Sequence, residues 1–167
     1  MKKILAIHYS QTGQLTDIMH NFMSPFSDAD IDFVKIEPAT PFPFPWTTAT
    51  FFDAMPETVK EHGMPLKPIT FKHENYDLIV LGYQPWFLSP SIPTVGLFQD
   101  QGFQKRIQNT EVVTVIGSRN MWLNAQESIK LLIQNAGGKL IGNIPLIDKN
   151  NNLVSAFTIL HWMLKGK

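Results

Sequence analysis

The chain has 167 residues and a mass of 19.0 kDa, which predicts a single domain, residues 1–167, with a substantial buried core. Its 14 lysines and arginines balance 14 aspartates and glutamates, whereas a protein that binds nucleic acid through phosphates would be basic. The absence of cysteine excludes disulfides, thiolate-ligated zinc, iron–sulfur clusters and a thiolate nucleophile.

Charged residues make up only 17% of the chain and aromatic residues 11%, so some rings are expected at a surface. A ligand, a partner subunit or a lipid-like substrate would cover them; the alternative is an ordinary core with half-exposed rings. No apolar run is long enough to span a bilayer. The apolar stretch at residues 4–7 is too short for a signal peptide, and we expect a cytoplasmic protein.

The first third of the chain alternates strand and helix patterns. Residues 3–9 (KILAIHY) form an apolar run typical of a buried parallel strand. Apolar residues then recur with helical spacing, and Ser24-Pro25 should end this helix. Its apolar face comprises Leu15, Ile18, Met19, Phe22 and Met23. Residues 31–36 (IDFVKI) predict a second strand.

A segment rich in proline and aromatic residues follows, from Pro38 to Pro68 within an insertion of about residues 38–72. Residues 41–46 should be extended. Residues 47–55 and 57–62 predict one helix broken at Pro56. A segment of this length inside a domain is usually functional. It could cover a ligand and form an apolar substrate pocket, or it could be a dimer interface or a self-packed lid.

The remaining elements continue the alternation. We predict strand 77–82, helix 93–101 with proline in its first turn, strand 111–116, helix 125–136, strand 139–147 and helix 153–164. Gly137-Gly138 should cap the helix before the last strand. This alternation predicts an α/β fold, in which a doubly wound parallel sheet has helices on both faces.

Ligands of such sheets bind beyond the carboxyl ends of the strands. Three predicted loops leave those ends, at residues 10–14, 83–90 and 117–121. The first loop carries two hydroxyl groups, Ser10 and Thr12, with Gly13, and it opens a helix whose free N–H groups can bind an anion. A plain capped helix is the alternative, because neither a Walker loop nor a G-x-G-x-x-G pattern is present.

The first loop, Ser10-Gln11-Thr12-Gly13-Gln14, resembles the phosphate loop of the flavodoxin family. Pro85-Trp86-Phe87 with Ser89-Pro90 resembles the loop after the third strand of that family, and Gly117-Ser118-Arg119-Asn120 its other flavin-flanking loop. The resemblance implies a five-stranded, three-layer fold with strand order 2-1-3-4-5 and FMN as cofactor. The FMN-binding residues that it implies are Ser10, Gln11, Thr12, Gly13, Gln14, Leu15, Thr16, Gln84, Pro85, Trp86, Phe87, Gly117, Ser118, Arg119 and Asn120.

The family has a threonine where this chain has Leu15, which weakens the predicted phosphate site. Thr16 or extra backbone donors would have to replace the lost phosphate contact. Electron-carrier flavodoxins are usually acidic, which this neutral chain is not. The chain is most similar to flavodoxin-like proteins of bacterial dialkylresorcinol gene clusters, on residues 10–14 and 119–122. Some of these are labelled condensing enzymes, but decarboxylative condensation normally needs a cysteine nucleophile.

Individual side chains leave alternatives open. Trp86 or Phe87 could stack on the flavin or pack against a helix. Arg119 could stabilise the reduced flavin, bind a nicotinamide-cofactor phosphate, or form a surface salt bridge. Asn120 should cap the next helix, Trp122 should lie in the core or an interface, and His8 should be a satisfied core histidine. The five histidines show no metal-binding spacing, so no metal site is expected.

We therefore expect an FMN-dependent oxidoreductase that acts on a hydrophobic, quinone- or resorcinol-like substrate, with NAD(P)H as a candidate electron donor. No catalytic residue is assigned. One alternative is a non-catalytic electron-transfer or accessory protein that docks a redox partner protein, and another is a flavodoxin fold that has lost FMN. A homodimer is one further expectation; nucleic acid and membrane-spanning segments are not expected.

Overall fold

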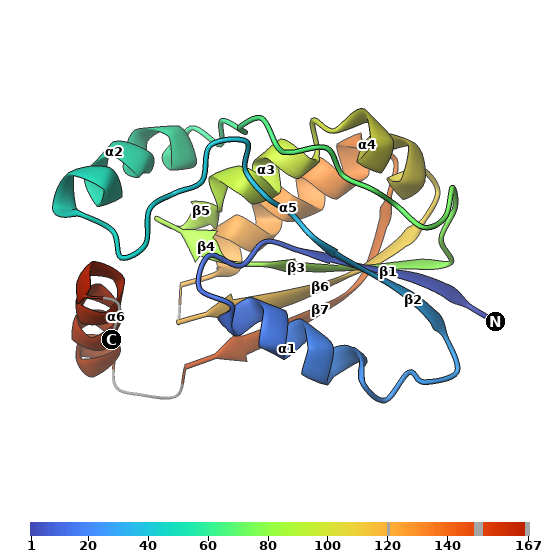
Figure 1. Ribbon diagram of the computed structural model, residues 1–167, viewed down its shortest axis with the longest axis horizontal. Helices are drawn as coiled ribbons and strands as arrows, with labels where there is room; N and C mark the ends of the chain where they lie inside the picture. Colours follow the sequence, from blue (N-terminus) through green and yellow to red (C-terminus); the bar gives the residue numbers. More distant parts are fainter. Residues whose placement is uncertain (120, 149–151, 166–167) are drawn as a thin grey trace.

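The computed structural model describes residues 1–119, 121–148 and 152–165. Its centre is a five-stranded parallel sheet with the order β2-β1-β3-β6-β7 (Figure 1). The strands are β1 (Lys3–His8), β2 (Asp30–Lys35), β3 (Leu78–Tyr83), β6 (Glu111–Ser118) and β7 (Lys139–Ile147). Taken in chain order, this arrangement confirms the predicted order 2-1-3-4-5.

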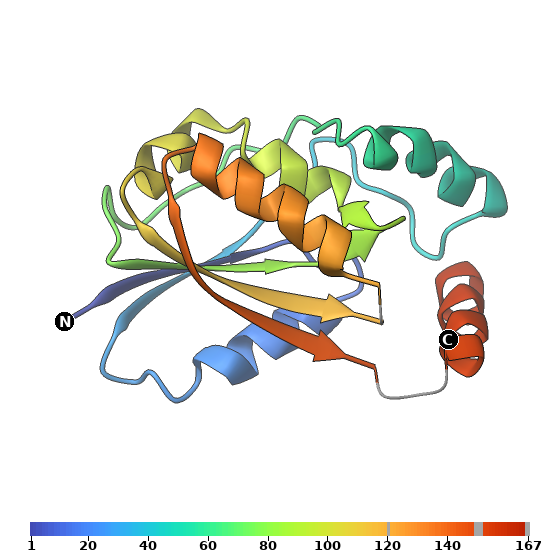
Figure 2. The ribbon, with the colours of Figure 1, turned by 180° about the vertical axis from the view of Figure 1, so that it is seen from behind.

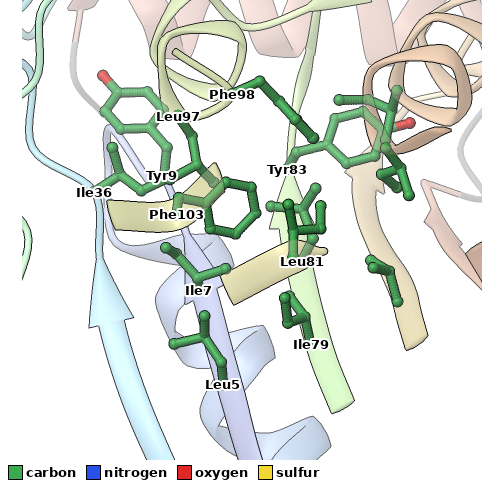
Figure 3. Close-up of a cluster of buried hydrophobic side chains, with 14 of the residues drawn as sticks. Leu5, Ile7, Tyr9, Ile36, Ile79, Leu81, Tyr83, Leu97, Phe98 and Phe103 are labelled. Atoms are coloured by element: carbon green, nitrogen blue, oxygen red, sulfur yellow. The ribbon is translucent and has the colours of Figure 1, made fainter. Parts of the chain in front are cut away.

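Helices cover both faces of the sheet. Helix α1 (Gln14–Met23) lies on one face, while α3 (Ile92–Leu97), α4 (Gln101–Ile107) and α5 (Leu123–Asn135) lie on the other (Figures 1 and 2). Side chains alternate between the faces along each strand, so Ile4 and Ala6 pack under α1 while Leu5 and Ile7 join the larger core. Figure 3 shows that larger core, where Phe103 lies between Ile7 and Leu81.

The connection from β3 to β6 differs from the prediction of one short helix at 93–101. A hairpin of β4 (Pro85–Trp86) and β5 (Ser89–Pro90) comes first, and two helices follow instead of one. The first helix ends at Leu97, and Asp100 begins the second because its side chain accepts a hydrogen bond from Phe103 N.

The insertion contains one continuous helix, α2 (Thr48–Val59), so the predicted break at Pro56 is wrong. Thr47 caps its N-terminus by accepting a hydrogen bond from Thr50 N. Pro56 lies close to the C-terminal end of the helix, and Lys60 N donates to the Pro56 carbonyl beyond it. Pro56 has no N–H to donate to the Phe52 carbonyl, so the helix continues past it with one backbone hydrogen bond fewer.

Two helices lie beyond the carboxyl ends of the strands rather than on a face of the sheet. These are α2 and the last helix, α6 (Asn152–Lys165) (Figures 1 and 2). Both therefore approach the edge where the predicted site loops emerge. None of the helices within the described ranges is long and apolar enough to cross a membrane.

Candidate functional site

A cleft of about 870 Å³ opens at the carboxyl ends of the strands. Its walls come from all three predicted loops, from the insertion, from the end of β7 and from α6. The lining residues are Gln11, Thr12, Gln14, Ile18, Phe44, Trp46, Phe51, Gln84, Pro85, Trp86, Phe87, Leu88, Gly117, Ser118, Arg119, Met121, Leu146, Asp148, Thr158 and Leu160. Three segments that are distant in sequence therefore meet at one site, as the strand order requires.

The first loop is held in shape by Ser10. Its buried Oγ accepts hydrogen bonds from the backbone N–H groups of Gly13 and Leu15, each at 3.1 Å. Gly13 stands at the N-cap position of α1 with φ of 92°, a left-handed conformation that glycine adopts without strain. The loop therefore turns sharply into the helix and leaves the positive end of the helix dipole at the cleft.

Thr12 provides the clearest sign that the loop receives a ligand. Its Oγ1 is buried and has no hydrogen-bond partner among the residues that the structure describes. A buried hydroxyl without a partner is costly, and an anion at this position would satisfy it. A phosphate at the start of α1 would meet the hydroxyl, the helix N-terminus and open backbone, so the loop fits a phosphate monoester.

Leu15 and Thr16 do not face this cradle. The Leu15 side chain is fully buried in the core under α1, and only its backbone N–H takes part in the loop. The Thr16 hydroxyl is 2.9 Å from Nε2 of His8, which is buried at the end of β1. The prediction of a satisfied core histidine is wrong for the other ring nitrogen, because the buried Nδ1 of His8 has no hydrogen-bond partner among the described residues. Thr16 thus links α1 to the sheet. A phosphate in this loop would be bound by Thr12 and the backbone, because Leu15 has no hydroxyl group.

The second loop forms an aromatic wall with the insertion. Trp86 contacts Trp46 edge-to-face with ring centroids 5.2 Å apart, and it meets Phe42 and Tyr9 in the same way at 5.1 and 5.9 Å. The ring of Phe87 packs against Phe51 at 4.9 Å. Burial raises the pKa of the Tyr9 hydroxyl, so this wall carries no charge at neutral pH. Such a wall suits a planar ring.

The third loop supplies Gly117, Ser118 and Arg119 to the lining of the cleft. Ser118 O accepts a hydrogen bond from Asp148 N, which joins the ends of β6 and β7. Asn120 lies outside the described residues, and the N-cap residue of α5 is Trp122 rather than Asn120. Trp122 packs against the main core, which is one of the two placements predicted for it.

The structure adds lining residues that the sequence did not indicate. These are Ile18, Leu88, Met121, Leu146, Asp148, Thr158 and Leu160. Leu88 and Met121 stand in predicted site loops, so position alone could have flagged them. Leu146 and Leu160 reach the cleft only through the placement of β7 and α6, for which the sequence has no local signal. Within the described residues, no group of three or more metal-binding side chains occurs.

The fold and the cleft together define a flavodoxin-like α/β protein. No family model and no curated protein matches the chain. Solved structures do: the complex of a flavoprotein with FMN from Lactobacillus acidophilus NCFM has a TM-score of 0.70 at 18% identity, covering 87% of this chain and 93% of its own.

Two further structures extend this similarity. A protein from Bacteroides eggerthii DSM 20697, classed provisionally as a flavoprotein, has a TM-score of 0.65 at 17% identity and covers 96% of this chain and 98% of its own. Oxidised flavodoxin 1 from Bacillus cereus has a TM-score of 0.52 at 10% identity, covering 97% and 96%. At these identities the similarity establishes the flavodoxin-like fold.

Proposed function

We propose that this protein binds FMN in the cleft and is an oxidoreductase that acts on a hydrophobic, quinone- or resorcinol-like substrate. The observation that carries the proposal is the pairing of two features in one cleft. The loop at residues 10–14 brings the unsatisfied Thr12 hydroxyl to the cleft, and the aromatic wall around Trp86 lines the same cleft. FMN has a phosphate and a planar ring system, and the Lactobacillus acidophilus flavoprotein of the same fold is described in complex with FMN.

Different residues of the cleft would bind different parts of FMN. Thr12 and the backbone of residues 11–14 would bind the phosphate, while Trp86 and Phe87 would contact the flavin ring. Arg119, which also lines the cleft, would stabilise negative charge on the reduced ring. When bound, FMN supplies hydride and electron transfer that no side chain of this protein can provide.

The substrate side of the proposal rests on the apolar character of the cleft. Among the described lining residues only Arg119 and Asp148 are ionisable, while the insertion contributes Phe44, Trp46 and Phe51. An uncharged ring is the substrate that such walls would accept. A quinone would take up two electrons and two protons, supplied as a hydride from NAD(P)H and a proton from water. The sequence resemblance to proteins of dialkylresorcinol gene clusters points to the same class.

A flavin-based electron carrier is the second candidate. The similarity to Bacillus cereus flavodoxin favours it, whereas the zero net charge does not, because carriers steer to their partners by charge. The cytoplasmic location and the homodimer expected from the sequence remain predictions in both cases.

Titration of the apo-protein with FMN and with riboflavin tests the cofactor. FMN should bind more tightly than riboflavin, which has no phosphate. Thr12→Val should weaken FMN about 10- to 100-fold, as for a lost hydrogen bond to a charged group, and leave riboflavin unchanged. Thr40→Val, at an exposed position outside the cleft, should change neither affinity. Equal affinities for FMN and riboflavin, or no binding of either, would refute the proposal.

The enzyme and the carrier are separated by the source of electrons. NAD(P)H alone should bleach the flavin of an enzyme, and added benzoquinone should restore the colour over many cycles. A carrier would need a separate reductase for the first step. Bleaching that depends strictly on such a reductase would overturn the oxidoreductase proposal and leave the FMN site intact.

A further inference from the structure

The tip of the β4–β5 hairpin has an unusual backbone. Trp86 pairs with Ser89, so Phe87 and Leu88 are the two residues of the connecting turn. Their φ angles are 47° and 71°, and both are therefore left-handed. Two-residue hairpin turns of this kind favour Asn-Gly or Gly-Gly, because side chains with a bulky Cβ disfavour positive φ. Phe-Leu is thus a poor choice for the turn itself, and such outliers cluster at functional sites.

The side chains at the tip face the cleft. Phe87 lines the aromatic wall through its contact with Phe51, and Leu88 lines the cleft further out, with 42% of its surface exposed. An Asn-Gly turn would remove both apolar contacts. Phe87 and Leu88 at the left-handed turn therefore present two large apolar side chains to whatever the cleft holds.

Leu88 belongs to an apolar rim that is built from separate segments. Phe44 from the insertion and Met121 from the loop after β6 also line the cleft, and they are 38% and 64% exposed. Two further exposed residues of the same cleft, Leu146 and Leu160, extend the rim toward β7 and α6. Apolar side chains thus line this cleft both at the wall of Phe87 and at its solvent-exposed rim. Exposed apolar side chains gathered at one cleft usually mark a binding surface.

Resting on the proposed function, we propose that the hairpin tip is a specificity element, and that Phe87 and Leu88 contact a hydrocarbon substituent projecting from the ring of the substrate. The substrate ring would lie beside the flavin that the aromatic wall holds, and the substituent would leave the cleft over Leu88 and Met121. The occupant follows from the apolar rim that lines the same cleft: a bare ring would leave Leu88 and Met121 uncovered, whereas an alkyl chain would contact both.

The test compares 2,3-dimethoxy-5-methyl-1,4-benzoquinone with the same quinone carrying a decyl chain. The FMN-loaded protein should bind the decyl quinone more tightly, as measured by quenching of tryptophan fluorescence, and should reduce it with a lower KM. Leu88→Gly and Met121→Ser should each weaken the decyl quinone about three- to tenfold, as expected for lost burial of one to two methylene groups. Neither variant should change the affinity for the quinone that lacks the decyl chain.

Leu88→Gly carries a second signature, because it also relieves the left-handed strain. Its melting temperature should rise by about 2–4 °C, which a lost structural contact would not produce. Leu131→Ala, at an exposed leucine on α5 outside the cleft, is the matched control and should affect neither quinone.

An unchanged preference for the decyl quinone in both rim variants would overturn the proposal. So would equal binding of the two quinones by the unaltered protein. If neither quinone is reduced, the proposed oxidoreductase activity fails, while the fluorescence titration still decides whether the hairpin selects the substituent.

Discussion

The Nε2 atom of His8 lies 2.9 Å from the Oγ1 atom of Thr16, so a buried imidazole at the end of β1 is tied to the first turn of α1. Burial, together with the smaller effects of the nearby His20 and Lys35 charges, lowers the pKa of His8 to about 4. His8 is therefore neutral in the folded protein at physiological pH, directly beneath the loop that forms the phosphate cradle.

This pKa makes stability depend on pH. In the unfolded chain His8 has its ordinary pKa of about 6.5, so between pH 6.5 and pH 4 the unfolded state binds more protons than the folded state. The stabilisation is complete above about pH 6.5 and is lost as the pH falls toward 4. The free energy of unfolding in urea should drop by about 2 kcal/mol between pH 7 and pH 5. His8→Gln should remove this pH dependence. An equally steep loss of stability in that variant would show that another group causes it.

Ser10→Ala should destabilise the protein, because two backbone N–H groups of the loop lose their acceptor. The loss of a cap of this type costs about 1–2 kcal/mol. Thermal unfolding of the apo-protein measures it independently of any ligand. Ser24→Ala is the control, since the Ser24 hydroxyl is exposed and donates only to Asn21 O at the other end of α1. Equal melting temperatures for Ser10→Ala and the unaltered protein would contradict the assigned role.

Gly96→Ala should loosen the contact between α3 and the insertion. A Cβ at residue 96 would lie 2.3 Å from the Met64 carbonyl oxygen, a backbone atom that cannot rotate away. Overpacking of this kind costs about 1–3 kcal/mol. Gly142→Ala places its Cβ at 3.4 Å from Val113 and should be much milder. Chemical denaturation of the two variants side by side checks the difference, and equal midpoints would count against it.

Arg119→Gln should make the bound flavin harder to reduce. Arg119 lines the cleft, and removing its positive charge withdraws stabilisation from the electron-rich reduced ring. A loss of about 1.4 kcal/mol corresponds to about 30 mV for two electrons, so the midpoint potential should fall by a few tens of millivolts. Arg119→Lys should retain most of the potential. Equilibration with a reference dye measures both variants, and a potential that rises in Arg119→Gln would rule out the proposed stabilisation.

The sheet was predictable because parallel strands are buried on both faces and appear as apolar runs. Strand β7 was predicted with its observed bounds, and β1 to within one residue. Helix α4 was missed because Gln101-Gly102 looks like the end of a helix. The spacing of Phe103 and Ile107, with Asp100 as a cap before them, was the overlooked signal.

The candidate site was predictable only where local chemistry marks it. Thr12 and Trp86 stand in loops whose composition identified them, and both line the cleft. Leu15 and Thr16 were included by position in the loop, but the helical repeat turns one into the core and the other toward His8. No local sequence pattern identifies Leu160 as a site residue, because its position depends on where α6 lies relative to the sheet.

The walls of the cleft come from segments far apart in the sequence, since Gln11 and Thr12 line it together with Leu146 and Asp148. Residues up to 148 must therefore be synthesised before this concavity exists. A nascent chain that ends before β7 has the N-terminal loop but lacks Leu146 and Asp148. Binding of a small molecule in the complete cleft would therefore report that the whole sheet has been completed.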